Sequence, residues 1–513
     1  MLFNSWQFMA FFAAVAGCYF LLMTDRVKTT QIMLLGASLY FYASWNPVYL
    51  VLILFSVGVT WASGLFMEKY PARKKLVLAA SLILNLSILF FFKYFNFFSD
   101  LVNRVGHVTG IGRILPGFSV LLPVGISFYT FQAIGYSIDV YKGTVKAERN
   151  LLIYALFVTF FPQLVAGPIE RSSNLLPQFK TVHPFDYNRT VDGLLLATWG
   201  LFKKVFIADR LAFYVDMVYG NTAVSSGIAL LTATVFFAFQ ILCDFSGYSD
   251  IAIGIAKVLG FDLMRNFRHP YFSKSIAEFW RRWHISLSSW FKDYVYIPLG
   301  GNRVSIPRYY FNLLATFLIS GLWHGAALHF VAWGALHGIY QIAGHFTKPY
   351  RRRLLEKCGI VTADGTKRWY QYVQVLFTFA FVCIGWIFFR VPNLTVVPEI
   401  LKRIFFIPKE VWWALKTGIG EMGFFACVRH LLCIRCSCFD DTLKGICVCV
   451  ICITILFVTA LYTRERRGFE VVRKLPTPIK WLCYYAVFYA AFAPIIWNLW
   501  KHIPTSEFVY FQF

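Results

Sequence analysis

Hydrophobic residues recur along the chain in long blocks, and short polar or basic stretches separate the blocks. A helix needs about 20 apolar residues to cross the hydrocarbon core of a bilayer. The pattern therefore predicts an all-α polytopic membrane protein. The predicted spans or membrane-embedded helices cover residues 6–23, 30–46, 49–66, 76–92, 115–136, 151–168, 192–217, 225–243, 249–261, 308–326, 328–345, 370–390, 444–463 and 480–499. Lys203-Lys204 interrupts 192–217, which favours a re-entrant or half-buried helix there.

The composition excludes an ordinary soluble protein. Of the 513 residues, 58% are hydrophobic and 14% are charged, whereas soluble chains carry about 25% charged residues. The formal net charge is +24, and the basic residues gather in short segments between apolar blocks: 68–75, 348–368 and 464–474. Such segments favour the cytoplasmic side and anionic lipid. We therefore expect both termini to be extracytoplasmic and no nucleic-acid partner.

The chain is expected to form one membrane domain. No low-complexity linker and no internal repeat divides it, which disfavours a transporter built from repeats. Seven of the twelve cysteines lie between Cys427 and Cys452 and resemble small apolar helix residues rather than a disulfide framework. His430 and the cysteines after it have a spacing that permits zinc, but no second compact ligand pair follows. We expect no metal site.

Residues 240–303 depart from plain spans, because acids, bases and histidines stand among aromatic residues there. Ionisable groups at membrane depth are costly and usually face a cavity where they have a function. Taken as one helix, Glu278–Asp293 has an aromatic stripe and a basic face, as an interfacial helix does. His284 falls at the boundary between the two faces. One interpretation is that an anionic ligand can reach the imidazole there. The other is that His284 belongs to an aromatic belt and has no chemical role.

His324 lies between Gly321 and Gly325 at the end of an apolar block. Glycines let another backbone or a ligand approach closely. A neutral imidazole at this depth can act as a general base. The alternative is a histidine satisfied by an interhelical hydrogen bond. His337, which also has glycine neighbours, supports the site or is purely structural.

Two carboxylates, Asp244 and Asp250, flank a short segment centred on Gly247. Gly247 is predicted to break the helix, since serines on both sides can satisfy the freed backbone groups. The carboxylates would then orient His324 or bind a cation. The alternative is that they form ion pairs with arginines, namely Arg265, Arg268 or Arg281.

With these residues identified, the chain resembles the membrane-bound O-acyltransferase superfamily, and within it the alginate O-acetylase branch. The resemblance covers nearly the whole chain. Its strongest blocks are Leu122–Gly143, Phe161–Arg171, Asp244–Arg303, Gly321–Ala326, Trp333–Gly338 and the terminal Phe508–Phe513.

The resemblance implies a ring of transmembrane and re-entrant helices around a central funnel, in a bacterial cytoplasmic membrane. It assigns His324 as the intramembrane catalytic histidine and His284 as the second functional histidine. It also implies acetyl-CoA as acyl-donor substrate, with no permanently bound cofactor. The implied partner is an extracytoplasmic, membrane-anchored, esterase-like acetyltransferase that acetylates a secreted or cell-wall polysaccharide.

Acyl transfer from a thioester needs a base, a grip on the donor and exclusion of water. His324 is the expected base, and the Trp323 indole N–H is a candidate oxyanion donor. The other candidate substrate-binding residues are Arg281, Arg282, Trp283, Lys292, Arg303, Asp244 and Asp250. In the aromatic C-terminal tail, Tyr510 either relays the acyl group as a tyrosyl ester or belongs to an interfacial anchor.

Two other functions stay open from the sequence. One is D-alanyl transfer to teichoic acid from a carrier-protein thioester, and the other is a transporter or flippase. The expected organisation is N-terminal spans over 1–115, a catalytic core over about 116–345 and C-terminal spans with the tail over about 370–513.

Overall fold

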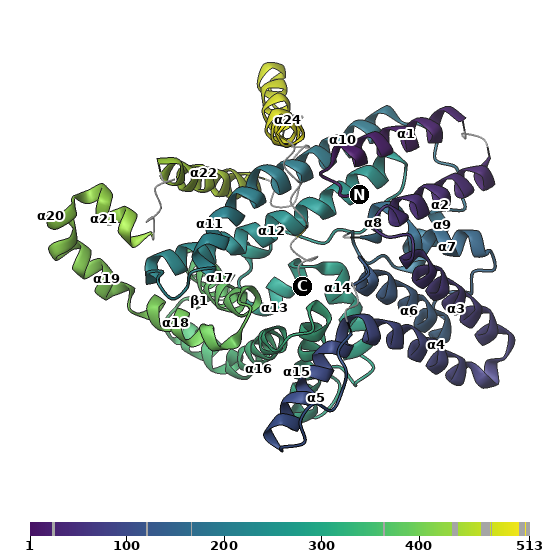
Figure 1. Ribbon diagram of the computed structural model, residues 1–513, viewed down its shortest axis with the longest axis horizontal. Helices are drawn as coiled ribbons and strands as arrows, with labels where there is room; N and C mark the ends of the chain where they lie inside the picture. The colour runs from purple at the N-terminus through teal and green to yellow at the C-terminus, as the bar shows by residue number, and fades with distance from the viewer. Residues whose placement is uncertain are drawn as a thin grey trace.

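The computed structural model describes residues 1–22, 26–118, 122–165, 167–362, 365–432, 440–462, 472, 474–501 and 508. These residues form helices almost throughout (Figure 1). The strands in the described part are β1 (Val361–Thr362) and β2 (Gly365–Thr366), a short antiparallel pair between two helices. The predicted all-α class is confirmed.

The N-terminal third consists of apolar helices joined by short turns. In chain order the elements are α1 (Trp6–Leu22), α2 (Val27–Ala43), α3 (Tyr49–Lys69), η1 (Pro71–Arg73), α4 (Lys74–Leu89), η2 (Phe90–Tyr94) and α5 (Phe95–Val108), where η marks a short 3₁₀ or π segment. Helices α3 and α4 pack with α6 (Ile126–Lys142) into a bundle at one end of the molecule (Figure 1).

The middle of the chain combines long spans with short, buried helices. Its elements are α7 (Leu151–Thr159), α8 (Phe161–Leu164), α9 (Ser172–Gln178), α10 (Tyr187–Leu201), η3 (Phe202–Ala208), α11 (Asp209–Tyr219), α12 (Gly227–Val258), η4 (Pro270–Phe272), α13 (Ile276–Arg282), α14 (Ile285–Phe291), η5 (Lys292–Tyr296), α15 (Ile306–His324) and α16 (Leu328–Lys357). The expected span at 151–168 is instead the short pair α7 and α8, both buried.

Helix α12 runs unbroken for 32 residues, so the predicted break at Gly247 is wrong. A Cβ atom on Gly247 would lie 2.8 Å from the Gly200 carbonyl oxygen of α10. Gly193 and Gly254 form a second such contact along the same seam. The glycines therefore let α10 and α12 pack with their backbones nearly touching, as small residues do at helix interfaces in membranes. The two helices run side by side in Figure 1.

The C-terminal part continues the helical arrangement. Its elements are α17 (Arg368–Arg390), η6 (Leu394–Val396), α18 (Val397–Phe405), α19 (Ile407–Trp413), η7 (Ala414–Gly418), α20 (Ile419–Met422), α21 (Phe424–Leu431), α22 (Asp440–Tyr462) and α24 (Thr477–Trp500). Cys433, Cys436 and Cys438 lie outside the described residues. Among those described, no cluster of three or more His, Cys, Asp or Glu side chains could hold a metal ion.

Among the described residues, five helical segments are long and apolar enough to cross a membrane. They are Tyr49–Lys69, Pro71–Val108, Gly227–Val258, Arg368–Arg390 and Thr477–Trp500. Helix α12 would extend about 48 Å at 1.5 Å per residue, which exceeds the hydrocarbon core of about 30 Å. The molecule is therefore a polytopic membrane protein. The central funnel and the three-part division of the chain stay predictions.

Candidate active site

His324 and His284 lie in the same aromatic core, although they come from different elements. His324 is the last residue of α15, and His284 immediately precedes α14. Their exposed fractions are 4% and 0%. The Trp323 ring contacts both imidazoles, with centroid distances of 5.9 Å to His284 and 5.0 Å to His324. The chain thus brings together the two histidines that the sequence singled out.

A backbone reversal turns His284 inward. The predicted continuous helix Glu278–Asp293 is wrong, because α13 ends at Arg282 and His284 adopts a left-handed conformation with φ of 42°. A positive φ is uncommon for a residue other than glycine and marks a site that the surrounding structure holds in place. His284 is consequently buried, rather than placed at the boundary of an amphipathic helix.

The segment around Asn266 satisfies the backbone groups that this reversal frees. The N–H of Ile285 donates to the Asn266 carbonyl at 2.9 Å, and the N–H of Arg268 donates to the Arg282 carbonyl at 3.0 Å. The Asn266 side chain also accepts from the Ser286 hydroxyl at 2.6 Å. Side-chain and loop contacts therefore replace the missing helical bonds, as buried backbone groups require.

Glu170 secures this supporting segment from the Phe161–Arg171 block. One carboxylate oxygen accepts from the Met264 N–H at 2.5 Å and the other from the Asn174 amide at 2.8 Å. Glu170 is 2% exposed, and burial raises the pKa of its carboxyl to about 7. The block thus contributes to the site indirectly, by holding the segment against which His284 turns.

Close helix packing positions the His324 ring. At Gly321 and Gly334, α15 and α16 approach so closely that an added Cβ atom would collide with the facing backbone. The helix ends directly after His324, because Gly325 is extended. The imidazole lies 5.0 Å from the Trp333 ring and 5.3 Å from the Phe389 ring, measured between centroids. The His324 ring is therefore packed among aromatic side chains.

Three buried polar atoms in this aromatic core have no hydrogen-bond partner within the described part of the chain. They are Nε2 of His284, Nε1 of Trp323 and Nε1 of Trp333. A buried polar atom without a partner is costly, and such atoms are often reserved for a ligand or a reaction. An acyl donor or acceptor entering this core would find a hydrogen-bonding group there. His337, by contrast, accepts from the Trp280 indole N–H at 3.2 Å.

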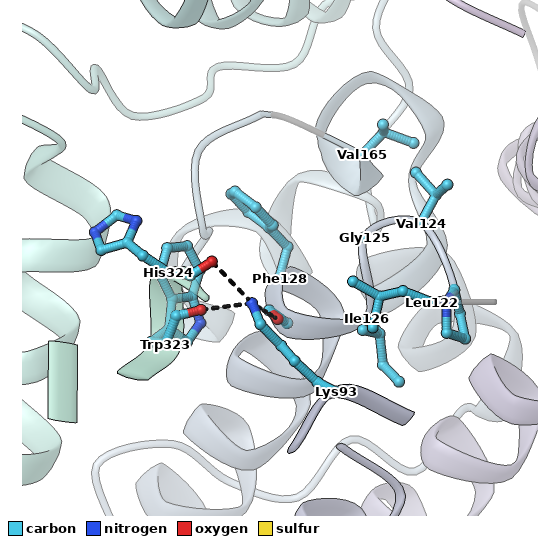
Figure 2. Close-up of a pocket in the computed structure, with 11 residues that line it drawn as sticks. Lys93, Leu122, Val124, Gly125, Ile126, Phe128, Val165, Trp323 and His324 are labelled. Carbon is cyan, nitrogen blue, oxygen red and sulfur yellow. Dashed lines mark hydrogen bonds between the residues drawn. The ribbon is translucent and has the colours of Figure 1, made fainter. Parts of the chain in front are cut away.

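Lys93, which the sequence analysis did not single out, reaches the helix end that carries His324. Its ammonium donates to the carbonyls of Trp323 and His324 at 2.6 and 3.2 Å and to the Ser127 hydroxyl at 3.3 Å. In Figure 2 the imidazole of His324 projects away from Lys93, whereas its carbonyl oxygen faces the ammonium. The available signal was a lone lysine inside the aromatic run Phe90–Phe98.

A small cavity of about 80 Å³ adjoins this lysine (Figure 2). Leu122 to Phe128, from the start of α6 and the turn before it, form one wall, and Val165, Trp323 and His324 complete the lining. Gly125 has a φ of 74°, and a Cβ atom there would lie 2.8 Å from the Leu164 carbonyl. The tight turn at Gly125 therefore shapes the cavity wall.

Asp244 and Asp250 form ion pairs with two adjacent lysines of η3. Asp244 lies 2.7 Å from the Lys204 ammonium, and Asp250 lies 2.7 Å from the Lys203 ammonium. The Asp244 and Lys204 side chains are 1% and 2% exposed. Ion pairing, one of the two interpretations, is thus present, although the expected arginine partners are replaced by lysines. The pairs also explain how Lys203-Lys204 can lie inside an apolar region.

The candidate donor-binding residues occupy two different environments. Arg281, Lys292 and Arg303 are exposed, and Arg282 pairs with Glu278 at 2.5 Å. Trp283 is 1% exposed and packs against other aromatic rings in the core. The structure therefore does not gather these residues around His324, and their binding roles stay predictions.

Phe508, the residue beyond Lys501 that the structure describes, lies in the same core. Phe508 is fully buried, and its ring lies 5.4 Å from the Phe245 ring and 4.6 Å from the Tyr248 ring. The Phe245 ring in turn lies 4.6 Å from the His284 imidazole. Tyr510 lies outside the described residues.

Fold and site define a polytopic helical membrane protein with a buried pair of histidines. The chain belongs to the membrane-bound O-acyltransferase family, whose model matches residues 37–391. It is an acyltransferase, and the resemblance to the alginate O-acetylase branch is confirmed.

Named relatives extend the comparison. The probable alginate O-acetylase AlgI of Pseudomonas syringae pv. tomato is 40% identical over 421 residues, which are 79% of this chain and 75% of that protein. The peptidoglycan O-acetyltransferase of Helicobacter pylori is 36% identical over 439 residues, 78% of this chain and 79% of its own. The teichoic acid D-alanyltransferase of Bacillus subtilis is 25% identical over 352 residues, 66% of this chain and 84% of its own.

Proposed function

We propose that this enzyme takes an acetyl group from cytoplasmic acetyl-CoA and passes it across the membrane for O-acetylation of a secreted or cell-wall polysaccharide. The observation that carries the proposal is the buried arrangement of His324, Trp323 and His284. The names of the alginate and peptidoglycan relatives support the acetyl group and the polysaccharide acceptor.

In the proposed reaction, His324 is the general base. It takes the proton of the acceptor hydroxyl while the hydroxyl oxygen bonds to the acetyl carbonyl carbon. The Trp323 indole N–H donates to the oxyanion that develops on the carbonyl. When the C–S bond breaks, the thiolate of CoA leaves and takes up a proton. His284 assists donor placement or this proton transfer, and the surrounding rings exclude water that would hydrolyse the thioester.

The donor is proposed to approach from the cytoplasm. The basic segment 68–75 lies beside the end of α6, where the Lys74 ammonium is 5.1 Å from the centre of the Tyr141 ring. Positive charge on this side fits a cytoplasmic face. The exposed Arg281, Lys292 and Arg303 are candidates for holding the phosphates of CoA. In this orientation the protein is a multi-pass protein of a bacterial cytoplasmic membrane with both termini extracytoplasmic.

The C-terminal tail is proposed to receive the acetyl group on the Tyr510 hydroxyl and to present it on the outer side. Burial of Phe508 against Phe245 and Tyr248 supports a tail that enters the core, since Phe245 touches His284. An extracytoplasmic, membrane-anchored, esterase-like acetyltransferase would then take the group from the tyrosyl ester and transfer it to a sugar hydroxyl.

A second candidate donor is a D-alanyl thioester on a carrier protein. Its support is the likeness to the teichoic acid D-alanyltransferase, which at 25% identity is more distant than the likeness to the acetylases. A carrier-protein donor would need a surface for a small acidic protein. Exposed basic residues would suit either the phosphates of acetyl-CoA or a small acidic carrier protein, so the higher identity to the acetylases is what favours acetyl-CoA.

The donor can be identified with purified protein in nanodiscs. Release of free CoA from acetyl-CoA, above the rate of empty nanodiscs, is the expected result. D-alanyl transfer from a charged carrier protein, with acetyl-CoA inert, would reject the acetyl proposal in favour of the second candidate.

A further inference from the structure

Lys93 is a partly buried cation in an apolar span, and its hydrogen bonds converge on the end of helix α15. It lies in the π segment η2, within the candidate span Pro71–Val108. A π segment inside a helix shifts the direction of the following side chains and often occurs at functional sites. Here it directs Lys93 to the end of α15, more than two hundred residues away along the chain.

The donors of the ammonium group are fully used by protein acceptors. A lysine has three N–H donors. Lys93 has three acceptors within hydrogen-bonding distance, namely the carbonyls of Trp323 and His324 and the hydroxyl of Ser127. No donor is left for a substrate. The geometry therefore argues against a role in binding the acyl donor and for a role in holding the protein itself.

The part of the protein that Lys93 holds is the C-terminus of helix α15. The last four carbonyls of a helix have no partner within it, and they carry the negative end of the helix dipole. At the end of α15, Lys93 satisfies the carbonyls of Trp323 and His324, while the Tyr94 hydroxyl donates to the Leu322 carbonyl at 2.9 Å. Two adjacent residues of η2 thus cap three consecutive carbonyls. The Lys93 ammonium binds the carbonyls of Trp323 and His324, the two site residues on this helix.

We propose that Lys93 is a positioning residue of the acyltransferase centre, whose ammonium fixes the helix end that carries Trp323 and His324. This inference rests on the proposed role of His324 as the base. Without the ammonium, α15 would lose its final cap, and the rings of Trp323 and His324 would lose their fixed direction. Misplacement of a reacting group by about 1 Å can cost about 100-fold in rate.

The test is steady-state release of CoA from acetyl-CoA by full-length variants in nanodiscs. Lys93→Met keeps an unbranched side chain one atom shorter and removes the donors and the charge. We expect kcat to fall about 100-fold while KM for acetyl-CoA changes by less than about threefold. Lys93→Arg keeps a cation with several donors, and the adjoining cavity gives room for the larger head group. It should recover most of kcat.

Lys257→Met is the matched control, because Lys257 forms a half-buried ion pair with Asp192 at 3.1 Å on the α10–α12 seam. It should keep the native kcat. A merely structural role for Lys93 would lower the yield or thermal stability of Lys93→Met and leave kcat per folded molecule unchanged. That result, or an equal loss in Lys93→Arg and Lys93→Met, would overturn the proposal.

A second measurement is independent of the donor. Hydrogen–deuterium exchange of the backbone amides from Ser320 to Ala327 should rise in Lys93→Met and not in Lys93→Arg or Lys257→Met. If native protein releases no CoA, the acetyl proposal fails, but hydrogen–deuterium exchange still tests whether Lys93 holds the end of α15. Unchanged exchange in Lys93→Met would reject the positioning role of Lys93. If Lys93→Met does not fold, Lys93→Gln, which retains one amide group, replaces it in both measurements with the same outcomes.

Discussion

The ion pair between Asp244 and Lys204 allows the structural and the substrate-binding interpretations of Asp244 to be separated. Both side chains are almost inaccessible, and the charged atoms are 2.7 Å apart. Replacing Asp244 by alanine leaves the Lys204 ammonium buried with one remaining carboxylate, Asp209, at 2.9 Å. Breaking a buried ion pair costs about 3–5 kcal/mol. Because Asp209 stays in place, we expect the lower end, about 3 kcal/mol.

The assay is thermal unfolding in detergent, followed by tryptophan fluorescence, together with the KM for acetyl-CoA. Asp244→Ala should lower Tm by several degrees and leave KM unchanged. Asp192→Ala is the control, since its ion pair with Lys257 is less buried, and it should cost about 1 kcal/mol or less.

The double variant Lys204→Met/Asp244→Leu should recover most of the loss in Tm, because well-packed apolar residues can replace a buried ion pair. A native Tm in Asp244→Ala, combined with a raised KM, would refute this reasoning. It would restore Asp244 as a substrate-binding residue.

Three further predictions concern the contact between α10 and α12, the proposed tyrosyl relay and the Glu170 carboxyl. Gly247→Leu should lower Tm strongly, because its Cβ would lie 2.8 Å from a backbone oxygen of α10. Gly36→Leu, with nothing within 4 Å of its Cβ, should not. Equal Tm values in the two variants would contradict the close packing of α10 and α12. Tyr510→Phe should abolish acetyl transfer to the outer acceptor while keeping the aromatic ring, and full transfer would reject the tyrosyl relay. The pKa of the Glu170 carboxyl is raised from 4.5 to about 7, so its contribution to stability is present below pH 4.5 and is lost as the pH rises through 7. Glu170→Gln should remove that part of the dependence of Tm on pH. An unchanged profile of Tm against pH would contradict this assignment to Glu170.

The helices were largely predictable because hydropathy depends on composition over a window, and exact ends matter little to it. Tyr49–Lys69 and Arg368–Arg390 begin and end close to the predicted spans. Gly247 was misassigned because a glycine in a helix is equally compatible with a break and with a close helix contact. Only the facing Gly200 decides between them, and a single sequence does not pair the two.

The site was predictable in its residues more than in its geometry. His284 and His324 were identified, but periodicity assumes a continuous helix, so the reversal at His284 was missed. Its cause is the distant Asn266 segment, which supplies hydrogen bonds that no local pattern encodes. The same holds for Lys93, whose acceptors lie at the far end of another helix.

The central claim is that His324 performs acyl transfer, and the most direct test is the rate of CoA release from acetyl-CoA by His324→Ala in nanodiscs. His345→Ala serves as the control, because this exposed histidine of α16 contacts Tyr310, away from the site. We predict that CoA release falls to background in His324→Ala and stays native in His345→Ala, with both variants folded. Native CoA release by His324→Ala would contradict the account.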